Sequence, residues 1–373
     1  MARYYIIAGE SSGDMHGANL MKSIQNHDRD ASFRFWGGDR MAHIAGQPVK
    51  HIRDLAFMGF WEVLINIRTI LKNIQNCKED IRKYQPDTIV LIDYPGFNLR
   101  IAKFAKALNI SVVYYISPQI WAWKQNRIRK IKKYVDKMLV ILPFEKDFYK
   151  RFGMDVDFVG HPLLDEMVPI RESSDLKTFK MINNLPDKPL VALLPGSRKQ
   201  EVSRMLESMV VMAGEFPDCQ FVVAGVSSLG ETFYDDFVRR DNLYVVFDQT
   251  YALLANASAA LVASGTATLE TALFGVPQTV CYKGNALSIL IARHLVHIKY
   301  ISLVNLIMDR PVLKELIQKD FNKKALKLEL ERLLYDQEYR LSMTNAYRKL
   351  EARLGGTGAS DQAAQIITRL STS

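Results

Sequence analysis

The chain has 373 residues, of which 48% are hydrophobic and 24% charged, a balance typical of a globular protein with a full core. At about 150 residues per domain, this length suggests two domains. Lys and Arg outnumber Asp and Glu by 49 to 40, a net charge of +9. Three widely spaced cysteines exclude a disulfide framework or a cysteine zinc site and favour a reducing compartment.

No segment of the sequence predicts a secretion signal or a membrane span. The apolar run at the N-terminus is too short for a signal peptide. The longest uncharged stretch, residues 249–269, carries too many polar side chains to cross a bilayer. We therefore expect a soluble or peripheral protein.

Short apolar runs alternate with longer amphipathic runs in the first half of the chain. The expected strands cover residues 4–8, 33–36, 88–92, 111–116, 137–142 and 157–159. The expected helices between them cover residues 16–26, 65–84, 99–108 and 126–134. Alternation of this kind predicts a parallel sheet with helices on both faces.

A second series of apolar runs follows, again interleaved with helical patterns. Its expected strands cover residues 190–194, 220–224, 243–247, 259–263 and 278–281. The proline-rich stretch 162–189 is the best candidate for a linker between the two series, and a final helix is expected at 361–370. We therefore predict an α/β protein of two doubly wound, Rossmann-like domains that face each other across a cleft.

The first glycine-rich turn, Gly9–Asp14, follows an expected strand and opens an expected helix. Its G-x-S-x-G spacing matches the nucleophile elbow of α/β-hydrolases, but that elbow normally follows several earlier strands. The dinucleotide pattern G-x-G-x-x-G is missing. The remaining interpretations are a loop whose amides hold a polar or anionic group and a plain tight turn with Ser12 or Asp14 as N-cap. Candidate substrate contacts in this loop are Glu10, Ser12, Gly13 and Asp14.

Asp93 stands at the end of the apolar run 88–92 and precedes Tyr94 and Pro95. In a doubly wound sheet, the carboxyl ends of the strands usually face the ligand. An aspartate in that place can act as a general base. The alternative interpretation is a turn-forming Asp before Pro95.

Two segments of the second half repeat the arrangement of strand, glycine turn and helix. In the first, Gly196, Ser197 and Arg198 combine backbone amides with a guanidinium, a pair well matched to a diphosphate. The alternative for Arg198 is an exposed residue that caps a helix.

The second segment is residues 264–270. With Thr266 as N-cap, Glu270 falls one position too late for a capping box. Its remaining roles are a weak interaction with the helix dipole or a contact with a ribose diol.

A basic run from Lys124 to Lys137 follows a segment with two tryptophans. It attracts phosphate in some form: nucleic acid, anionic lipid or a phosphorylated substrate. Ile128, Ile131 and Val135 recur at helical spacing, which makes the basic residues a solvated face, with a phosphate role for part of it. The apolar stretch 55–71 is interpreted as core or as a surface that enters a bilayer interface.

Taken together, seven segments resemble the lipid-A-disaccharide synthase family. They are AGESSGD (8–14), MGFWEV (58–63), SPQIWAWK (117–124), LPFEKDFY (142–149), VGHP (159–162), LLPGSRKQEV (193–202) and SGTATLE (264–270). The resemblance implies an inverting, metal-independent GT-B glycosyltransferase without a cofactor. It would join UDP-2,3-diacylglucosamine to 2,3-diacylglucosamine 1-phosphate and release UDP.

The resemblance also implies an organisation for the chain. Residues 1–165 would bind the acceptor, residues 166–350 the UDP-sugar, and the helix in 351–373 would return to the first domain. The enzyme would work in the cytoplasm, peripheral on the inner membrane and in contact with its anionic surface. It would bind no nucleic acid and is able to form a homodimer.

Site roles carry over residue by residue. Asp93 becomes the base for the acceptor 6-hydroxyl, and Asn98 and Asn305 become substrate contacts. The nucleotide-binding set comprises Gly196, Ser197, Arg198 and Glu201 at the diphosphate, Ser264, Gly265 and Thr266 at the phosphate region, and Glu270 at the ribose. One departure matters: Gly96 stands where the family often has a second acid, so we expect Asp93 to act alone.

Two rival functions remain open. One is another UDP-sugar transferase or a UDP-sugar epimerase of the same fold, which would use Arg198 and Glu270 in the same way. The other is a basic nucleic-acid-binding protein that uses residues 124–137, for which steeply salt-dependent binding is expected.

Overall fold

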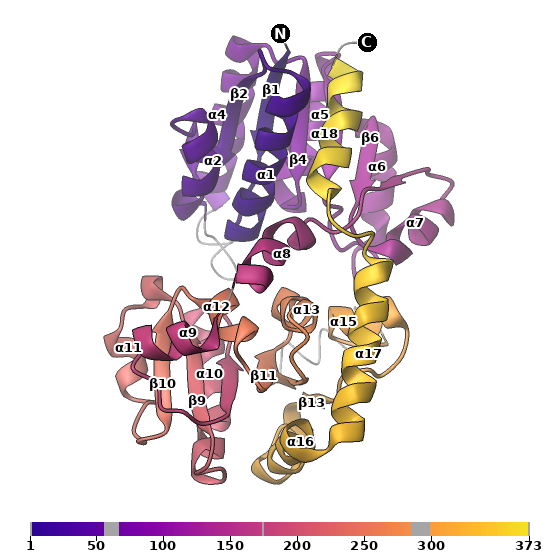
Figure 1. Ribbon diagram of the computed structural model, residues 1–373. Helices are drawn as coiled ribbons and strands as arrows, with labels where there is room; N and C mark the ends of the chain where they lie inside the picture. The colour runs from indigo at the N-terminus through magenta and orange to yellow at the C-terminus, as the bar shows by residue number, and fades with distance from the viewer. Residues whose placement is uncertain (1, 56–66, 174, 285–298, 372–373) are drawn as a thin grey trace. The chain divides into compact units, whose positions relative to one another are not determined.

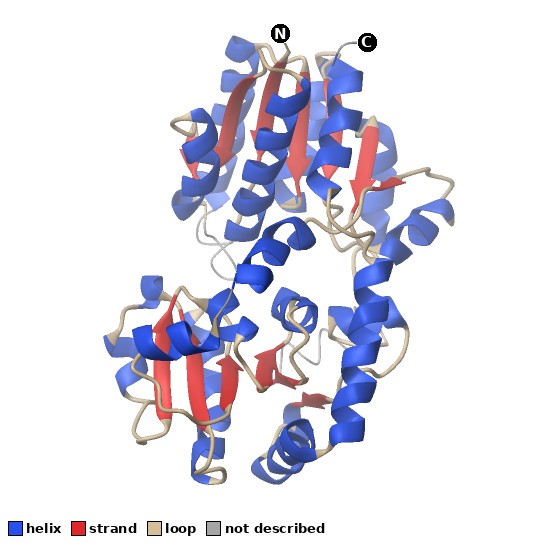
Figure 2. Cartoon of the chain, in the orientation of Figure 1, coloured by secondary structure: helices blue, strands red, loops and turns tan. Residues whose placement is uncertain are grey.

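The computed structural model describes residues 2–55, 67–173, 175–284 and 299–371. The chain forms two compact units: unit 1 comprises Met1–Pro162 and Leu354–Ser373, and unit 2 comprises Leu163–Arg353. Each unit contains its own parallel sheet with helices on both faces (Figures 1 and 2). The predicted fold class, two doubly wound α/β sheets, is confirmed. Among the residues described, no helix is long and apolar enough to cross a membrane.

The sheet of unit 1 has seven strands in the order β3-β2-β1-β4-β5-β6-β7. They are β1 (Arg3–Ile7), β2 (Ser32–Gly37), β3 (Lys50–His51), β4 (Thr88–Ile92), β5 (Ser111–Tyr115), β6 (Lys137–Val140) and β7 (Asp157–Phe158). Helices cover both faces, which explains why the central strands read as continuous apolar runs. In β4, every residue is buried.

The helices of unit 1 include six that lie between its strands and one from the end of the chain. They are α1 (Ser11–His27), α2 (Asp39–Ala45), α4 (Ile67–Tyr84), α5 (Pro95–Ala107), α6 (Ile128–Tyr134), α7 (Pro143–Lys150) and α18 (Ala359–Ser371). Helix α18 packs beside α1 (Figure 1). The hydroxyl of Ser371 lies 2.8 Å from that of Thr88, at the start of β4.

The sheet of unit 2 has six strands in the order β10-β9-β8-β11-β12-β13. They are β8 (Leu190–Leu194), β9 (Gln220–Gly225), β10 (Leu243–Phe247), β11 (Ala259–Ala263), β12 (Gln278–Tyr282) and β13 (Glu315–Ile317). Its helices are α8 (Leu163–Ser173), α9 (Leu176–Ile182), α10 (Lys199–Met209), α11 (Thr232–Asp235), α12 (Thr250–Ala255), α13 (Thr266–Leu273), α15 (Leu303–Met308), α16 (Lys323–Tyr335) and α17 (Gln337–Arg353).

Some sequence-based predictions of local structure were wrong. The expected linker 162–189 contains α8 and α9, and α8 packs on α12 and α13 within unit 2. The strands β3 and β13 were not predicted. They have only two and three residues, too few to show an alternation of apolar and polar side chains. Residues 56–66 of the apolar stretch 55–71, including the segment MGFWEV, lie outside the described residues.

In each sheet the chain order reverses at one pair of neighbouring strands. In unit 1 this pair is β1 and β4, and in unit 2 it is β8 and β11. Connections leave such a pair in opposite directions, which opens a crevice at the carboxyl ends of the two strands, where ligands of doubly wound sheets bind. The fold therefore points to the loops after β1, β4, β8 and β11.

We predict that Ile367→Ala destabilises unit 1 by about 2–5 kcal/mol, because the side chain is fully buried on α18. The measurement is urea-induced unfolding of the purified protein. Gln362→Ala, an exposed position on the same helix, is the matched control and should leave the midpoint nearly unchanged. Equal midpoints for the two variants would show that α18 does not contribute to the core of unit 1.

Candidate functional site

The reversal point of unit 1 brings together the loop after β1 and the loop after β4. Gly9 lies on the first loop and Tyr94 on the second. A Cβ atom on Gly9 would lie only 2.5 Å from the Tyr94 ring. Glycine is therefore required at position 9 for the two loops to touch.

The backbone at Asp93 and Tyr94 is left-handed, with φ of +41° and +45°. This conformation costs about 1–2 kcal/mol for a residue with a side chain. Asn98 on α5 stabilises the bend: its amide group donates to the carbonyl oxygens of Ile92, at 3.1 Å, and Asp93, at 2.8 Å. The hydroxyl of Tyr114 donates to the same Asp93 carbonyl.

Burial raises the pKa of the Asp93 carboxyl to about 7. The negative charge of Glu10 raises this pKa further, whereas the backbone amide of Tyr94 and the charge of Arg127 oppose the shift. A carboxylate with a pKa near neutrality is well matched to accepting a proton from a substrate hydroxyl. The geometry therefore supports Asp93 as a candidate base.

The remaining candidates of the Gly9–Asp14 loop have different surroundings. Glu10, not Ser12 or Asp14, is the N-cap of α1, and Ser12 lies exposed in the first turn. Gly13 is buried, and a Cβ there would meet the Cβ of Ala8 at 3.2 Å. This loop thus presents Glu10, Ser11 and Ser12 as its accessible polar side chains.

Asp14 caps a different helix from the one on which it lies. Its carboxylate accepts hydrogen bonds from the amides of Gly38 at 2.6 Å, Arg40 at 3.1 Å and Met41 at 3.1 Å, around the start of α2. These three bonds occupy the carboxylate. Asp14 therefore stabilises the loop before α2, and the expectation that it caps its own helix was wrong.

In unit 2, the loop after β8 combines a glycine of positive φ with an exposed arginine. Gly196 has φ of +105°, and a Cβ there would lie 2.5 Å from the Glu201 carboxylate. That carboxylate accepts a hydrogen bond from the amide of Ser197, and burial raises its pKa, against the effect of Arg198. Arg198 is exposed and is the N-cap residue of α10. Glu201 therefore fixes the turn, and the guanidinium of Arg198 is accessible to an anion.

The neighbouring loop, after β11, opens helix α13. The N-cap is Gly265, with φ of +135°, and not Thr266 as the sequence suggested. Ser264 is half-buried, whereas Gly265 and Thr266 are exposed. Because the helix begins one residue earlier than expected, Glu270 lies beyond its first turn.

The Glu270 carboxyl is held from α12, where the hydroxyl of Tyr251 donates to it at 3.4 Å. Burial raises the pKa of Glu270 to about 7. A carboxyl group in this state can accept a hydrogen bond from a diol when ionised and donate one when protonated.

Asn305, on α15, is only 1% exposed and is bonded within unit 2. Its amide nitrogen donates to the Leu313 carbonyl at 3.0 Å and to the Glu315 carboxylate at 2.9 Å, and its oxygen accepts from the Leu313 amide at 2.8 Å. Direct contact with a substrate would require an exchange of these bonds. The structure thus gives Asn305 the role of anchoring the segment before β13.

Sequence reasoning missed two residues next to Asp93. Tyr114, at the end of β5, bonds to its carbonyl group, and the charge of Arg127 acts on its carboxyl group. Sequence reasoning assigned Arg127 to the solvated basic face, and Tyr114 was hidden in an apolar strand. The apolar face of α6 was predicted correctly: Ile128, Ile131 and Val135 are all buried.

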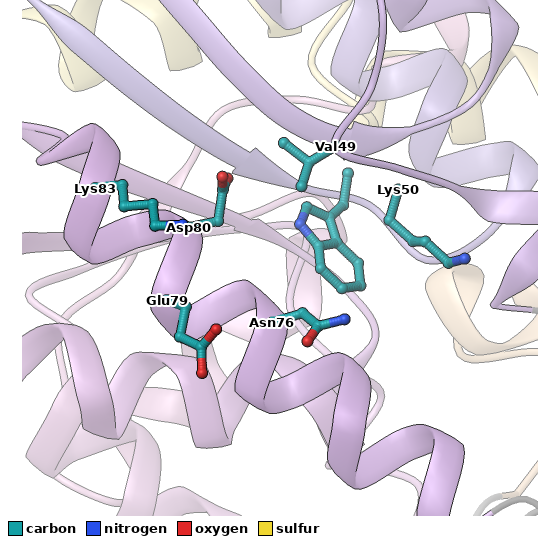
Figure 3. A pocket seen from close by; sticks show the side chains of 7 residues that line it. Val49, Lys50, Asn76, Glu79, Asp80 and Lys83 are labelled. Carbon is teal, nitrogen blue, oxygen red and sulfur yellow. The ribbon is translucent and has the colours of Figure 1, made fainter.

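The described residues contain no grouped metal ligands, and one of their pockets, away from the two reversal points, could be mistaken for a site. In the described part of the chain, no three His, Cys, Asp or Glu side chains are grouped as metal ligands. Figure 3 shows a pocket of about 240 Å³ whose lining residues come from β2, β3, α4 and the segment before β3, not from either reversal point. Asp80 in this pocket is already paired with Arg34 at 2.6 Å and bonded to Tyr5 at 2.8 Å. We assign no ligand to it.

The sequence matches one family over nearly its whole length. A family model described as lipid-A-disaccharide synthetase matches residues 4–367. A lipid-A-disaccharide synthase of Syntrophus aciditrophicus is 41% identical over 98% of this chain and 97% of its own length. Synthases of Trichlorobacter lovleyi and Coxiella burnetii are 37% and 38% identical, each over 98% of this chain and over 96% and 97% of their own lengths.

Solved structures with the same fold have distant sequences. UDP-GlcNAc 2-epimerase from Neisseria meningitidis, bound to UDP-GlcNAc, has a TM-score of 0.70 at 13% identity and covers 98% of this chain and 100% of its own. The glycotransferase of kitacinnamycin has a TM-score of 0.69 at 12% identity and covers 99% of both chains. At this identity the likeness establishes the GT-B-like fold and nothing finer.

We predict that Glu10→Gln lowers the pKa of Asp93 below about 7, because it removes a nearby negative charge that disfavours the ionised carboxylate. Arg127→Gln should raise the same pKa. The measurement is a titration of ¹³C-labelled aspartate carboxyl groups by NMR. Glu79→Gln, an exposed position on α4, is the control and should change nothing. An Asp93 titration that is unaffected by either charge would contradict the described arrangement.

Proposed function

The chain belongs to the lipid-A-disaccharide synthase family, a family of glycosyltransferases in lipid A biosynthesis, and we propose how its two units divide the reaction. The reaction joins a UDP-linked, acylated glucosamine to an acylated glucosamine 1-phosphate and releases UDP. It requires a base for the attacking hydroxyl and neutralisation of the departing diphosphate. In this proposal unit 1 provides the base and unit 2 receives the diphosphate.

Asp93 is the proposed base, and the place of its carboxyl group, half-buried directly after β4, is the observation that carries this assignment. The ionised carboxylate takes the proton of the acceptor 6-hydroxyl while the hydroxyl oxygen bonds to C1 of the donor sugar. The bond between C1 and the phosphate oxygen breaks, its electron pair leaves with UDP, and C1 is inverted. Asn98 and Tyr114 act as positioning residues, because they hold the backbone from which the carboxylate projects.

The charge on the departing UDP is the second requirement. We assign it to the loop after β8, where the Arg198 guanidinium can form two parallel hydrogen bonds to phosphate oxygens. The exposed turn Gly265–Thr266 offers backbone amides at the start of α13, and such fixed donors stabilise developing negative charge without reorganisation. Glu201 supports the first turn, and Glu270 is the proposed ribose contact.

Two acylated substrates require access to a membrane surface, and we place this enzyme peripherally on the cytoplasmic face of the inner membrane. Ile67 and Leu71 on α4 support the assignment, since they are 47% and 56% exposed directly after the apolar segment. Net positive charge favours an anionic lipid surface. The test is retention on anionic vesicles of the wild-type protein and its loss in Ile67→Ser/Leu71→Ser.

We predict that Asp93→Asn lowers kcat by about two to four orders of magnitude, the range expected for a lost general base. In the wild type, kcat/KM should fall below pH about 7, because protonation removes the base. The measurement is formation of the disaccharide 1-phosphate by the purified enzyme, identified by mass spectrometry. Near-normal turnover of the variant would remove Asp93 from this role.

The same assay separates the proposed function from its rivals. Asp155→Asn, at an exposed position of unit 1 just before β7, is the matched control for Asp93→Asn and should keep normal turnover. Turnover of UDP-GlcNAc without an acylated acceptor would favour an epimerase or another transferase.

We predict that Arg198→Ala weakens inhibition by UDP about 10- to 100-fold, since a lost charge-assisted hydrogen bond costs about 1.5–3 kcal/mol. The measurement is the inhibition constant of UDP in the transferase assay. Arg204→Ala, at an exposed position farther along α10, removes the same charge and should leave UDP inhibition intact. Unchanged inhibition in Arg198→Ala would refute the diphosphate assignment.

A further inference from the structure

Three side chains at the start of the basic run form a compact cluster, which we call the Trp123 cluster: Trp123, Lys124 and Arg127. The Lys124 ammonium lies 4.2 Å from the centre of the Trp123 ring, and the Arg127 guanidinium lies 5.6 Å from the same ring. Trp123 is 41% exposed, and Arg127 is half-buried. Cation–π contacts of this kind stabilise a cation over the face of the ring. The ring therefore holds two positive charges beside each other.

Two lysines at or near the end of the basic run are paired with carboxylates. Lys106 pairs with Asp136, and Lys137 pairs with Asp157. In the described residues, neither Lys124 nor Arg127 forms such an ion pair. Burial and the neighbouring charge of Arg127 lower the pKa of Lys124, as expected for like charges held together. Two adjacent cations without a paired carboxylate leave a place where an added anion relieves their repulsion.

The Trp123 cluster also lies near the proposed base. The charge of Arg127 acts on both Asp93 and Tyr114, so this half-buried guanidinium lies within electrostatic range of the reversal point of unit 1. The acceptor of the proposed reaction carries its reacting hydroxyl and its phosphate on one sugar ring. A base and a phosphate site for this acceptor must therefore lie within the length of a hexose.

We propose that the Trp123 cluster is the subsite for the phosphate monoester of the acceptor sugar, with Lys124 and Arg127 as its two cationic contacts. The inference rests on the proposed function and adds a second point of recognition to it. Asp93 contacts the reacting hydroxyl of the acceptor, and the Trp123 cluster contacts its phosphate. Together these two contacts fix the orientation of the sugar ring. The phosphate of an anionic lipid headgroup shares this chemistry, so the experiment has to separate the two sources.

The test compares two acceptors, the acylated glucosamine 1-phosphate and the same sugar without its phosphate. In the wild type the phosphorylated acceptor should have the higher kcat/KM. In Lys124→Gln/Arg127→Gln this preference should fall by about 10- to 100-fold, while KM for the UDP-sugar stays unchanged. The preference is a ratio in which Asp93 acts on both acceptors, so an altered pKa of Asp93 cancels. Lys130→Gln, an exposed position on α6, is the matched control and should retain the preference.

Calorimetric binding of each acceptor gives a second readout that does not need turnover. Equal loss of binding for the two acceptors, or an undiminished preference in the double variant, would overturn the proposal. Vesicles with and without phosphatidylglycerol form the other arm of the experiment. A double variant that loses binding to anionic vesicles and keeps the preference would assign the cluster to a lipid surface and overturn the acceptor site. A wild type that binds the phosphorylated acceptor without forming a disaccharide would instead refute the proposed function.

Discussion

A half-buried carboxyl group at the end of a parallel strand is the constraint on which the loops at the reversal point of unit 1 depend. Burial disfavours the ionised form of Asp93, and the left-handed backbone at Asp93 and Tyr94 is unfavourable for residues with side chains. Asn98 and the missing side chain of Gly9 are the features that make this arrangement possible. Strain and burial concentrated at one position are characteristic of functional sites rather than of structural turns.

In unit 2, the loop at the reversal point carries a positively charged side chain where unit 1 has a carboxyl group. There, the glycine turns at Gly196 and Gly265 lead into the starts of α10 and α13, where helix amides carry partial positive charge, and Arg198 supplies a formal positive charge. The two sheets share one topology, yet the residues that follow their strands differ in sign. In the proposed division of the reaction, the same fold accepts a proton in one unit and binds an anion in the other, which is how a doubly wound sheet supports different chemistry at its reversal point.

The strands and the residues at their ends were predictable, because buried parallel strands are continuous apolar runs that end abruptly at polar residues. Asp93 and Arg198 were found in this way. What escaped prediction depends on contacts between distant segments. The Asp14 carboxylate accepts a hydrogen bond at the start of α2 from the amide of Gly38, which lies 24 residues later in the chain. The charge of Arg127 acts on Asp93 because of how the segment before α6 folds. The start of α1 was placed late, since its first turn contains serines and a glycine and shows no apolar periodicity.

Unit 1 is assembled from two stretches of chain, whereas unit 2 is continuous. Helix α18 covers part of the first sheet, yet it follows every element of unit 2 in the chain and is therefore made after them. Domains usually complete their folding in the order of synthesis. In this protein the sequence of unit 2 is complete before that of unit 1. Unit 2 can therefore finish folding while unit 1 still exposes the surface that α18 covers. Nascent chains of this enzyme therefore present an unfinished apolar face until α18 has been made, a period in which chaperones can bind it.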